Sequence, residues 1–444
     1  MRSAFTRLLC GAVVTALGMQ AATPATGPAT YTVLHQFAAS ANLSPECTLL
    51  EVSPGEFMGT LVVDGTIQTR IFWVTSTGQF AILASMNKNQ DGAWTEGALV
   101  QANNGAVYGS TMGYGPNGLG TVFRTNTQGA VSVVNSQFSI PSPLVEGSDG
   151  YLYGTGFQTS STYGLFRLSL GGTFASFFAF PGTFSYTTLV PTGPVLQASD
   201  GNFYGELFSG GSTIFQITPQ GAYKALYQRS DLLVGGLLEA PNGLLYGAGQ
   251  GAAFSISKTG VYTMLHTFQN EGAPQSGLTL ASDGFLYGGT AWNISGVGNG
   301  PAGIYRVGLD GSNYSLVYSF GDAYAGVYTL GPSVVQGSDG KLYGAQINGT
   351  NNQIFSLDLG LPKPQPVLTG FTPKAGAPGT VVQIAGSQLL GATGVSFDGT
   401  PAPAFVNRGG SYVQATVPPG ATSGKITVTT PNGEASTPHN FTVK

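Results

Sequence analysis

Short apolar runs alternate with turn residues along most of this chain, and the pattern predicts β-strands joined by tight turns. One phrase carries the pattern, and its clearest copy reads Ser-Asp-Gly-Lys-Leu-Tyr-Gly. Copies of it, some of them weaker, lie at 54–59, 104–109, 148–154, 199–205, 242–247, 282–288 and 338–344. A recurrence of roughly 40 to 56 residues is typical of proteins built from repeated supersecondary units.

Each repeat contains four apolar segments. In the sixth repeat they cover 276–281, 285–288, 303–307 and 314–320, and Asp-Gly pairs separate the first from the second and the third from the fourth. Asp-Gly favours tight hairpin turns, and four strands in such a unit are typical of a propeller blade. The glycine after each tyrosine predicts close approach of neighbouring backbones, and the aromatic side chains predict packing between blades.

The seventh repeat lacks a fourth strand, because a Pro-rich segment at 361–366 follows its third strand. The missing strand is predicted at the other end of the chain, where 31–37 matches the fourth strand of the fifth repeat, 262–268, at five of seven positions. The sequence therefore predicts a seven-bladed β-propeller over 31–360. An N-terminal strand completes its last blade and removes an exposed edge.

The segment 361–366 predicts a stiff, extended linker. Beyond it the phrase does not recur, and 367–444 alternates apolar runs with Gly, Pro and Asn turns. The apolar runs lie at 381–384, 394–397, 412–417, 425–429 and 440–443. Their spacing predicts a small C-terminal β-sandwich, so the predicted fold class is all-β.

These motifs resemble two known families. The phrase Ser-Asp-Gly-x-Phe/Leu-Tyr-Gly, with the run at 120–124, resembles the Gloeo/Verruco repeat of exported bacterial proteins. That resemblance implies a propeller and no general activity. The C-terminal segment, with Phe-Thr-Pro at 371–373, Gly376 and Val-Pro at 417–418, resembles the IPT/TIG family of immunoglobulin-like domains. That resemblance implies a spacer or a binding module.

The first residues have the pattern of a secretory signal peptide over 1–22, followed by a short linker over 23–30. Two arginines precede an apolar core at 8–17, and Gln-Ala-Ala forms a small-residue cleavage region. The apolar run is too short to span a bilayer, so we expect a secreted or cell-envelope protein without a membrane span. After cleavage Cys47 would be the only cysteine, and we interpret it as a buried apolar residue.

Charge is sparse: the chain has 16 basic and 20 acidic residues and a net charge of −4. There is no basic cluster, so nucleic acid is not an expected partner. His35 and His266 occupy the same repeat position in outermost strands, and His439 lies in the C-terminal segment. A histidine metal site or a catalytic triad is therefore not expected, and neither is a cofactor.

Four carboxylates recur at one position of the phrase, in Asp149, Asp200, Asp283 and Asp339. They could be interpreted as a calcium site or an acid–base ring. We interpret them as turn residues, because other copies of the phrase have Asn or Pro there, and Asn serves a turn equally well without a charge.

Candidate binding residues lie on the opposite face of the predicted propeller. The short turns share one face of the disc, so the long, variable loops and the connections between blades share the other. These loops carry aromatic, acidic and amide side chains suited to a carbohydrate or protein ligand. The candidates are Asp91, Trp94, Glu96, Tyr114, Tyr186, Trp292, Asn293, Asp322, Tyr324 and Tyr328.

Three functions are compatible with this pattern. The first is a non-catalytic, exported binding or surface-interaction protein. The second is a carbohydrate-active lyase or hydrolase, with Glu206, Asp231 and Asp322 as candidate acids in the loops at the channel mouth. The third is a purely structural envelope component. The sequence leaves the identity of the ligand and the oligomeric state open.

Overall fold

The protein is almost entirely β-structure. The computed structural model describes residues 29–38, 43–45, 48–63, 66–95, 98–137, 142–159, 162–180, 190–191, 193–208, 212–229, 233–249, 251–269, 271–274, 276–291, 302–321, 333–347 and 352–444. The predicted signal peptide, most of the predicted N-terminal linker and Cys47 lie outside these residues. The only helix in the described part is α1 (Lys88–Asp91), and no helix there is long and apolar enough to cross a membrane.

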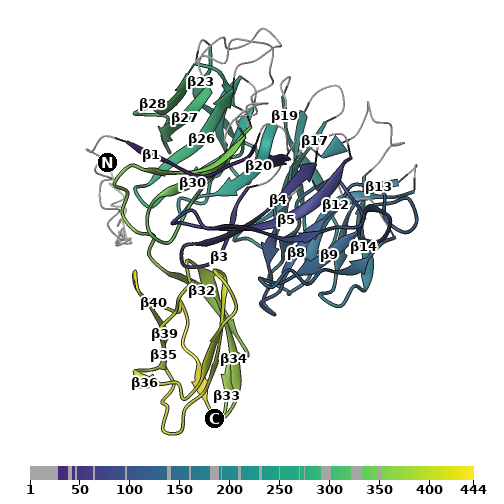
Figure 1. Ribbon diagram of the computed structural model, residues 1–444. Helices are drawn as coiled ribbons and strands as arrows, with labels where there is room; N and C mark the ends of the chain where they lie inside the picture. The colour runs from purple at the N-terminus through teal and green to yellow at the C-terminus, as the bar shows by residue number, and fades with distance from the viewer. Residues whose placement is uncertain are drawn as a thin grey trace, which may run out of the picture.

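Seven antiparallel sheets precede residue 360 in the described part of the chain (Figure 1). The first contains β2 (Leu43–Pro45), β3 (Leu50–Ser53), β4 (Glu56–Val63), β5 (Gln68–Thr75) and β6 (Phe80–Ser85). The second contains β7 (Val100–Gln101), β8 (Val107–Ser110), β9 (Val122–Thr125) and β10 (Ser132–Asn135). The third contains β11 (Val145–Glu146), β12 (Leu152–Thr159), β13 (Thr162–Leu168) and β14 (Phe174–Ala179).

The next three sheets repeat this arrangement. The fourth contains β15 (Val190–Pro191), β16 (Leu196–Gln197), β17 (Phe203–Phe208), β18 (Ser212–Ile217) and β19 (Tyr223–Arg229). The fifth contains β20 (Leu233–Glu239), β21 (Leu245–Gly249), β22 (Ala252–Ile256) and β23 (Tyr262–Thr267). The sixth contains β24 (Ala273–Pro274), β25 (Thr279–Leu280), β26 (Phe285–Ala291), β27 (Ala302–Gly308) and β28 (Ser315–Gly321).

The seventh sheet joins the two ends of the repeat region. It contains β29 (Ser333–Gln336), β30 (Leu342–Gln346), β31 (Gln353–Asp358) and, beside β31, the N-terminal strand β1 (Thr30–Gln36). The register pairs Tyr31 with Leu357 and Gln36 with Gln353. The predicted pairing of the N-terminal strand with the last repeat is confirmed.

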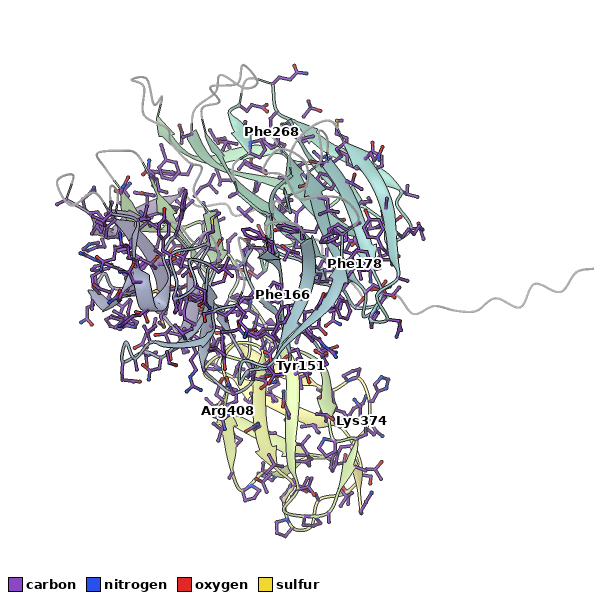
Figure 2. The ribbon with its side chains drawn as sticks, turned by 90° about the vertical axis from the view of Figure 1, so that its right-hand side faces the viewer. Tyr151, Phe166, Phe178, Phe268, Lys374 and Arg408 are labelled. Atoms are coloured by element: carbon purple, nitrogen blue, oxygen red, sulfur yellow. The ribbon has the colours of Figure 1, made fainter. Side chains whose placement is uncertain are left out.

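Aromatic side chains fill the space between neighbouring sheets, as the sequence predicts. Tyr343 of the seventh sheet and Phe57 of the first are both fully buried, and their ring centroids lie 4.2 Å apart. Phe166, Phe178 and Phe268, labelled in Figure 2, belong to clusters shared by other pairs of neighbouring sheets. Each sheet therefore hides one face against the next, and burial of these large side chains stabilises the arrangement.

The glycine after the tyrosine has a different role from the predicted one. A Cβ atom added at Gly205 would lie 2.7 Å from Cζ of Phe215, and one at Gly154 would lie 2.7 Å from Cζ of Phe166. These glycines make room for an aromatic ring of the adjacent strand and not for a neighbouring backbone. The expectation of close backbone approach at this position was wrong.

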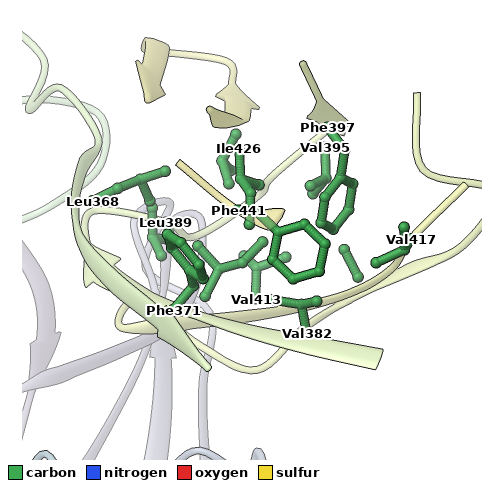
Figure 3. Close-up of a cluster of buried hydrophobic side chains, with 13 residues drawn as sticks. Leu368, Phe371, Val382, Leu389, Val395, Phe397, Val413, Val417, Ile426 and Phe441 are labelled. Carbon is green, nitrogen blue, oxygen red and sulfur yellow. The ribbon is translucent and has the colours of Figure 1, made fainter. Parts of the chain in front are cut away.

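The C-terminal segment forms two further four-stranded sheets around a core of its own. One has the order β32 (Val367–Thr372), β34 (Val381–Ser387), β38 (Tyr412–Thr416), β37 (Phe405–Asn407). The other has the order β36 (Thr400–Pro401), β35 (Gly394–Phe397), β39 (Ile426–Thr430), β40 (Gly433–Ser436). β33 (Ala375–Gly376) pairs in parallel with β41 (Thr442–Val443). Figure 3 shows Phe371, Phe397 and Phe441 in the shared core.

Candidate functional site

The repeated aspartates are structural, as their position in the turns predicts. In the fourth sheet, Oδ1 of Asp200 accepts a hydrogen bond from the backbone N–H of Asn202 at 3.1 Å, and Oδ2 accepts one from the Tyr204 hydroxyl at 2.7 Å. Burial alone would raise the pKa of Asp200, but the hydrogen bonds from Tyr204 and Asn202 outweigh it and hold the pKa below its usual value. The same two contacts occur at Asp149, Asp283 and Asp339.

Copies of the phrase that carry Asn keep the turn and reverse one hydrogen bond. The Asn242 amide donates to the Tyr246 hydroxyl at 2.7 Å, and that hydroxyl donates in turn to the Leu309 carbonyl of the next sheet at 3.2 Å. A charge is therefore not needed at this position, because either donor direction locks the tyrosine in place. This pattern supports the turn interpretation over a calcium or acid–base ring.

A Glu or Gln two residues before the Ser position links neighbouring sheets. Glu51 of the first sheet accepts hydrogen bonds from the backbone N–H and the hydroxyl of Ser338 in the seventh, at 2.8 and 2.7 Å. Glu239 makes the same two contacts with Ser199, both at 2.7 Å. The other residues in this role are Glu146, Gln197 and Gln336.

This link is absent from the sequence-based prediction, although the sequence contains its signal. The Glu or Gln recurs at a fixed offset in six of the seven repeats, and the sixth repeat has Leu280 instead. At the Ser position of the preceding repeat stands Pro241, which has no backbone N–H to donate. The departure from the pattern thus falls where the hydrogen bond cannot form.

Two of the predicted binding residues lie on neighbouring loop segments. The connection between the first and second sheets pairs with the loop between β8 and β9 through a bridge from Ala93 to Gly113. The backbone N–H of Met112 also donates to the Trp94 carbonyl at 2.9 Å. Trp94 and Tyr114 therefore lie on neighbouring segments, and they are 42% and 48% exposed.

Both aromatic residues adopt a backbone conformation that is unusual for large side chains. Trp94 has φ of 63° and Tyr114 has φ of 65°, in the left-handed region. Buried threonines hold the loop: the Thr121 hydroxyl donates to the Asp91 carbonyl at 2.5 Å, and the hydroxyls of Thr111 and Thr121 lie 3.0 Å apart. Such strain persists only where the surrounding contacts enforce it, and it is concentrated at functional sites.

Asp91 has a structural contact instead of a free carboxylate. Its Oδ2 accepts a hydrogen bond from the backbone N–H of Asn87 at 2.8 Å, at the start of the short helix α1. Seven other predicted binding residues lie outside the described part of the chain, as does the candidate acid Asp231. They are Glu96, Tyr186, Trp292, Asn293, Asp322, Tyr324 and Tyr328.

The candidate acid Glu206 does not lie in a loop. It lies within strand β17, pairs with Ile214 and is only 3% exposed, so its predicted place in the loops at the channel mouth was wrong. His35 and His266 stack on Phe80 and Tyr314 of the following sheets, each with centroids 3.6 Å apart. Among the described residues, no group of three His, Cys, Asp or Glu side chains could hold a metal ion.

Comparisons with known proteins identify the fold only. No family model matches the chain, and no curated protein matches its sequence. An oligogalacturonate lyase in complex with manganese has a TM-score of 0.52 and 11% identity, covering 76% of this chain and 97% of its own. An extracellular domain from B. thetaiotaomicron, assigned to a hybrid two component system, has a TM-score of 0.50 and 13% identity, covering 91% of this chain and 46% of its own. The sheet order and these likenesses together show a β-propeller.

Proposed function

We propose that this protein is an exported, non-catalytic binding protein that holds a carbohydrate on the variable-loop face of its propeller. The observation that carries the proposal is the pair Trp94 and Tyr114, two exposed aromatic side chains held on left-handed backbone. Exposed aromatic rings on strained backbone do not stabilise the loop. We therefore infer that the loop holds these rings in place to bind a ligand.

The chemistry around the two rings suits a neutral, hydroxyl-rich ligand. Aromatic rings present flat apolar faces that pack against the C–H face of a sugar. The segments beside them carry the amides of Asn89, Gln90 and Asn117, which can donate to and accept from hydroxyl groups. A protein ligand is the alternative, because exposed aromatic residues also anchor protein interfaces.

The architecture proposed with this function has three parts. The seven sheets are the blades of one closed ring over 31–360, and 361–366 connects it to an IPT/TIG-like immunoglobulin domain over 367–444. The pattern of residues 1–22 supports export to the periplasm, the outer surface or the medium. The confirmed β1–β31 pairing supports closure of the ring.

A glycan array probed with the mature protein tests the proposal. We expect binding to one class of neutral glycan, and a loss of affinity of about tenfold or more in Trp94→Ala and in Tyr114→Ala. Val261→Ala is the matched control, because Val261 is also an exposed apolar residue, on the turn before an outer strand. Unchanged binding in both aromatic variants would place the ligand elsewhere. If no glycan binds, the carbohydrate proposal is wrong.

A further inference from the structure

The Pro-rich linker lies on the propeller instead of extending into solvent. The Ser282 hydroxyl and the Gln336 amide both donate to the Pro362 carbonyl, the second at 3.2 Å. Leu361 is buried, and a Cβ atom added at Gly340 would lie 2.8 Å from its carbonyl oxygen. The linker therefore packs on the turns of the sixth and seventh sheets.

The C-terminal domain also contacts the turns of the seventh sheet. The Asn432 amide donates to the Ser338 carbonyl at 2.7 Å and to the Pro364 carbonyl at 3.1 Å. Ser338 is the residue whose N–H and hydroxyl bond to Glu51 of the first sheet. One side chain of the domain thus reaches the residue that links the last and first sheets.

Further contacts extend to the first and second sheets. A Cβ atom added at Gly391 would lie 2.9 Å from Cγ of Pro54, so the two turns are in close contact. Arg408 donates to the Asn104 carbonyl at 3.4 Å, and its guanidinium is oriented by Gln414 at 3.3 and 3.1 Å.

The domain also approaches the third sheet. Figure 2 places Arg408 and Tyr151, a residue of the third repeat, beside this junction. Burial raises the pKa of Tyr412 to about 12, and the negative charges of Glu146 and Asp149 in the third repeat add to the effect. The domain therefore reaches from the seventh sheet across the first and second toward the third.

These contacts lie next to the place where the ring closes. A single chain can close such a ring only by non-covalent pairing of two strands, and here the strands are β1 and β31. The domain is covalently attached beyond β31, and it contacts the first and second sheets, which follow β1 in the chain. Opening the ring at this ladder would pull these contacts apart. We propose that the C-terminal domain is an intramolecular clasp, whose binding surface is the turn face of its own propeller and whose action is to hold the β1–β31 ladder closed.

Hydrogen exchange of the full chain, followed by mass spectrometry, tests the clasp. The double variant Arg408→Ala/Asn432→Ala removes both side-chain donors, and Asn440→Ala is the control, because it truncates an exposed amide of the same domain. We expect the amides of β1 to exchange about tenfold faster in the double variant, the effect of losing hydrogen bonds of ordinary strength.

The internal reference is β23, the equivalent outer strand of the fifth sheet. We expect no change there, because a short turn joins β23 to its neighbour β22, whereas the chain does not join β1 to its neighbour β31. Equal rates in β1 for the double variant and the control would overturn the proposal, and so would equal acceleration of β1 and β23. If the double variant does not fold, Asn432→Ala alone is measured against the same control, and the same outcomes decide.

Discussion

Replacing Glu51 by Ala should weaken the junction between the first and seventh sheets. Its carboxylate accepts three hydrogen bonds, from the N–H and the hydroxyl of Ser338 at 2.8 and 2.7 Å and from the N–H of Gly55 at 2.8 Å. Burial raises the pKa of Glu51, although these hydrogen bonds oppose the shift. The carboxylate is therefore costly to bury, and its three donors offset that cost.

The loss can be estimated from the groups left behind. After truncation the Ser338 hydroxyl can turn to water, while the N–H groups of Ser338 and Gly55 lose their acceptor. Each such orphaned group costs about 1 to 3 kcal/mol, and release of the half-buried carboxylate returns part of that. We therefore expect Glu51→Ala to lower the free energy of unfolding by about 2 to 3 kcal/mol.

The chain provides its own control for this experiment. At the equivalent position of other repeats, Gln197 and Gln336 accept a hydrogen bond from the N–H at the Ser position of the preceding repeat, at 2.7 and 2.8 Å. Each of their amides donates to the carbonyl of the glycine four residues later. Glu51→Gln should therefore cost less than about 1 kcal/mol. Urea denaturation of both variants gives the two values. A loss below about 0.5 kcal/mol for Glu51→Ala, or equal losses for the two variants, would refute the reasoning.

Two further predictions concern the third and fourth sheets. Burial raises the pKa of Glu146 from 4.5 to about 7, despite a hydrogen bond from Asn103. Between pH 4.5 and 7 the folded state therefore binds more protons than the unfolded state, so the free energy of unfolding should fall as the pH rises through this range. Glu146→Gln should flatten that fall, and thermal midpoints measured across this range check it; an unchanged slope would contradict it. Gly205→Ala should cost about 1 to 3 kcal/mol in urea denaturation, because its methyl group meets the Phe215 ring. Gly171→Ala, which meets only the Ser169 hydroxyl at 3.9 Å, should be close to neutral, and equal effects would contradict the steric argument.

Features that depend on local sequence could be predicted. Asp-Gly and Asn-Gly turns could be predicted because few other residue pairs favour the backbone conformation of a two-residue hairpin turn. The N-terminal strand could be assigned because it shares its pattern with the fifth repeat, and its pairing with β31 is confirmed. The loop positions of Trp94 and Tyr114 followed from the order of the strands, and a bridge from Ala93 to Gly113 brings the two loops side by side.

Features that depend on contacts between segments far apart in the sequence could not be predicted. Glu51 and Ser338 lie 287 positions apart, and only the recurring Glu or Gln of the repeats signals their contact. Arg408 and Asn104 lie 304 positions apart, and no repeated pattern signals theirs. The left-handed backbone at Trp94 was also not predictable, because it occurs at a large residue, beside the bridge from Ala93 to Gly113, and not at a glycine. Glu206 follows the last glycine of the phrase, where the sequence predicts a loop, but strand β17 continues to Phe208.

The central claim is that function resides on the face with Trp94 and Tyr114, while the face with the Asp-Gly turns is structural. Hydroxyl-radical footprinting with and without the glycan selected on the array tests it most directly. The claim predicts that the ligand reduces oxidation of Trp94 and Tyr114 and leaves that of Tyr151, near the turn face, unchanged. Protection of Tyr151 with unchanged oxidation of Trp94 and Tyr114 would contradict it.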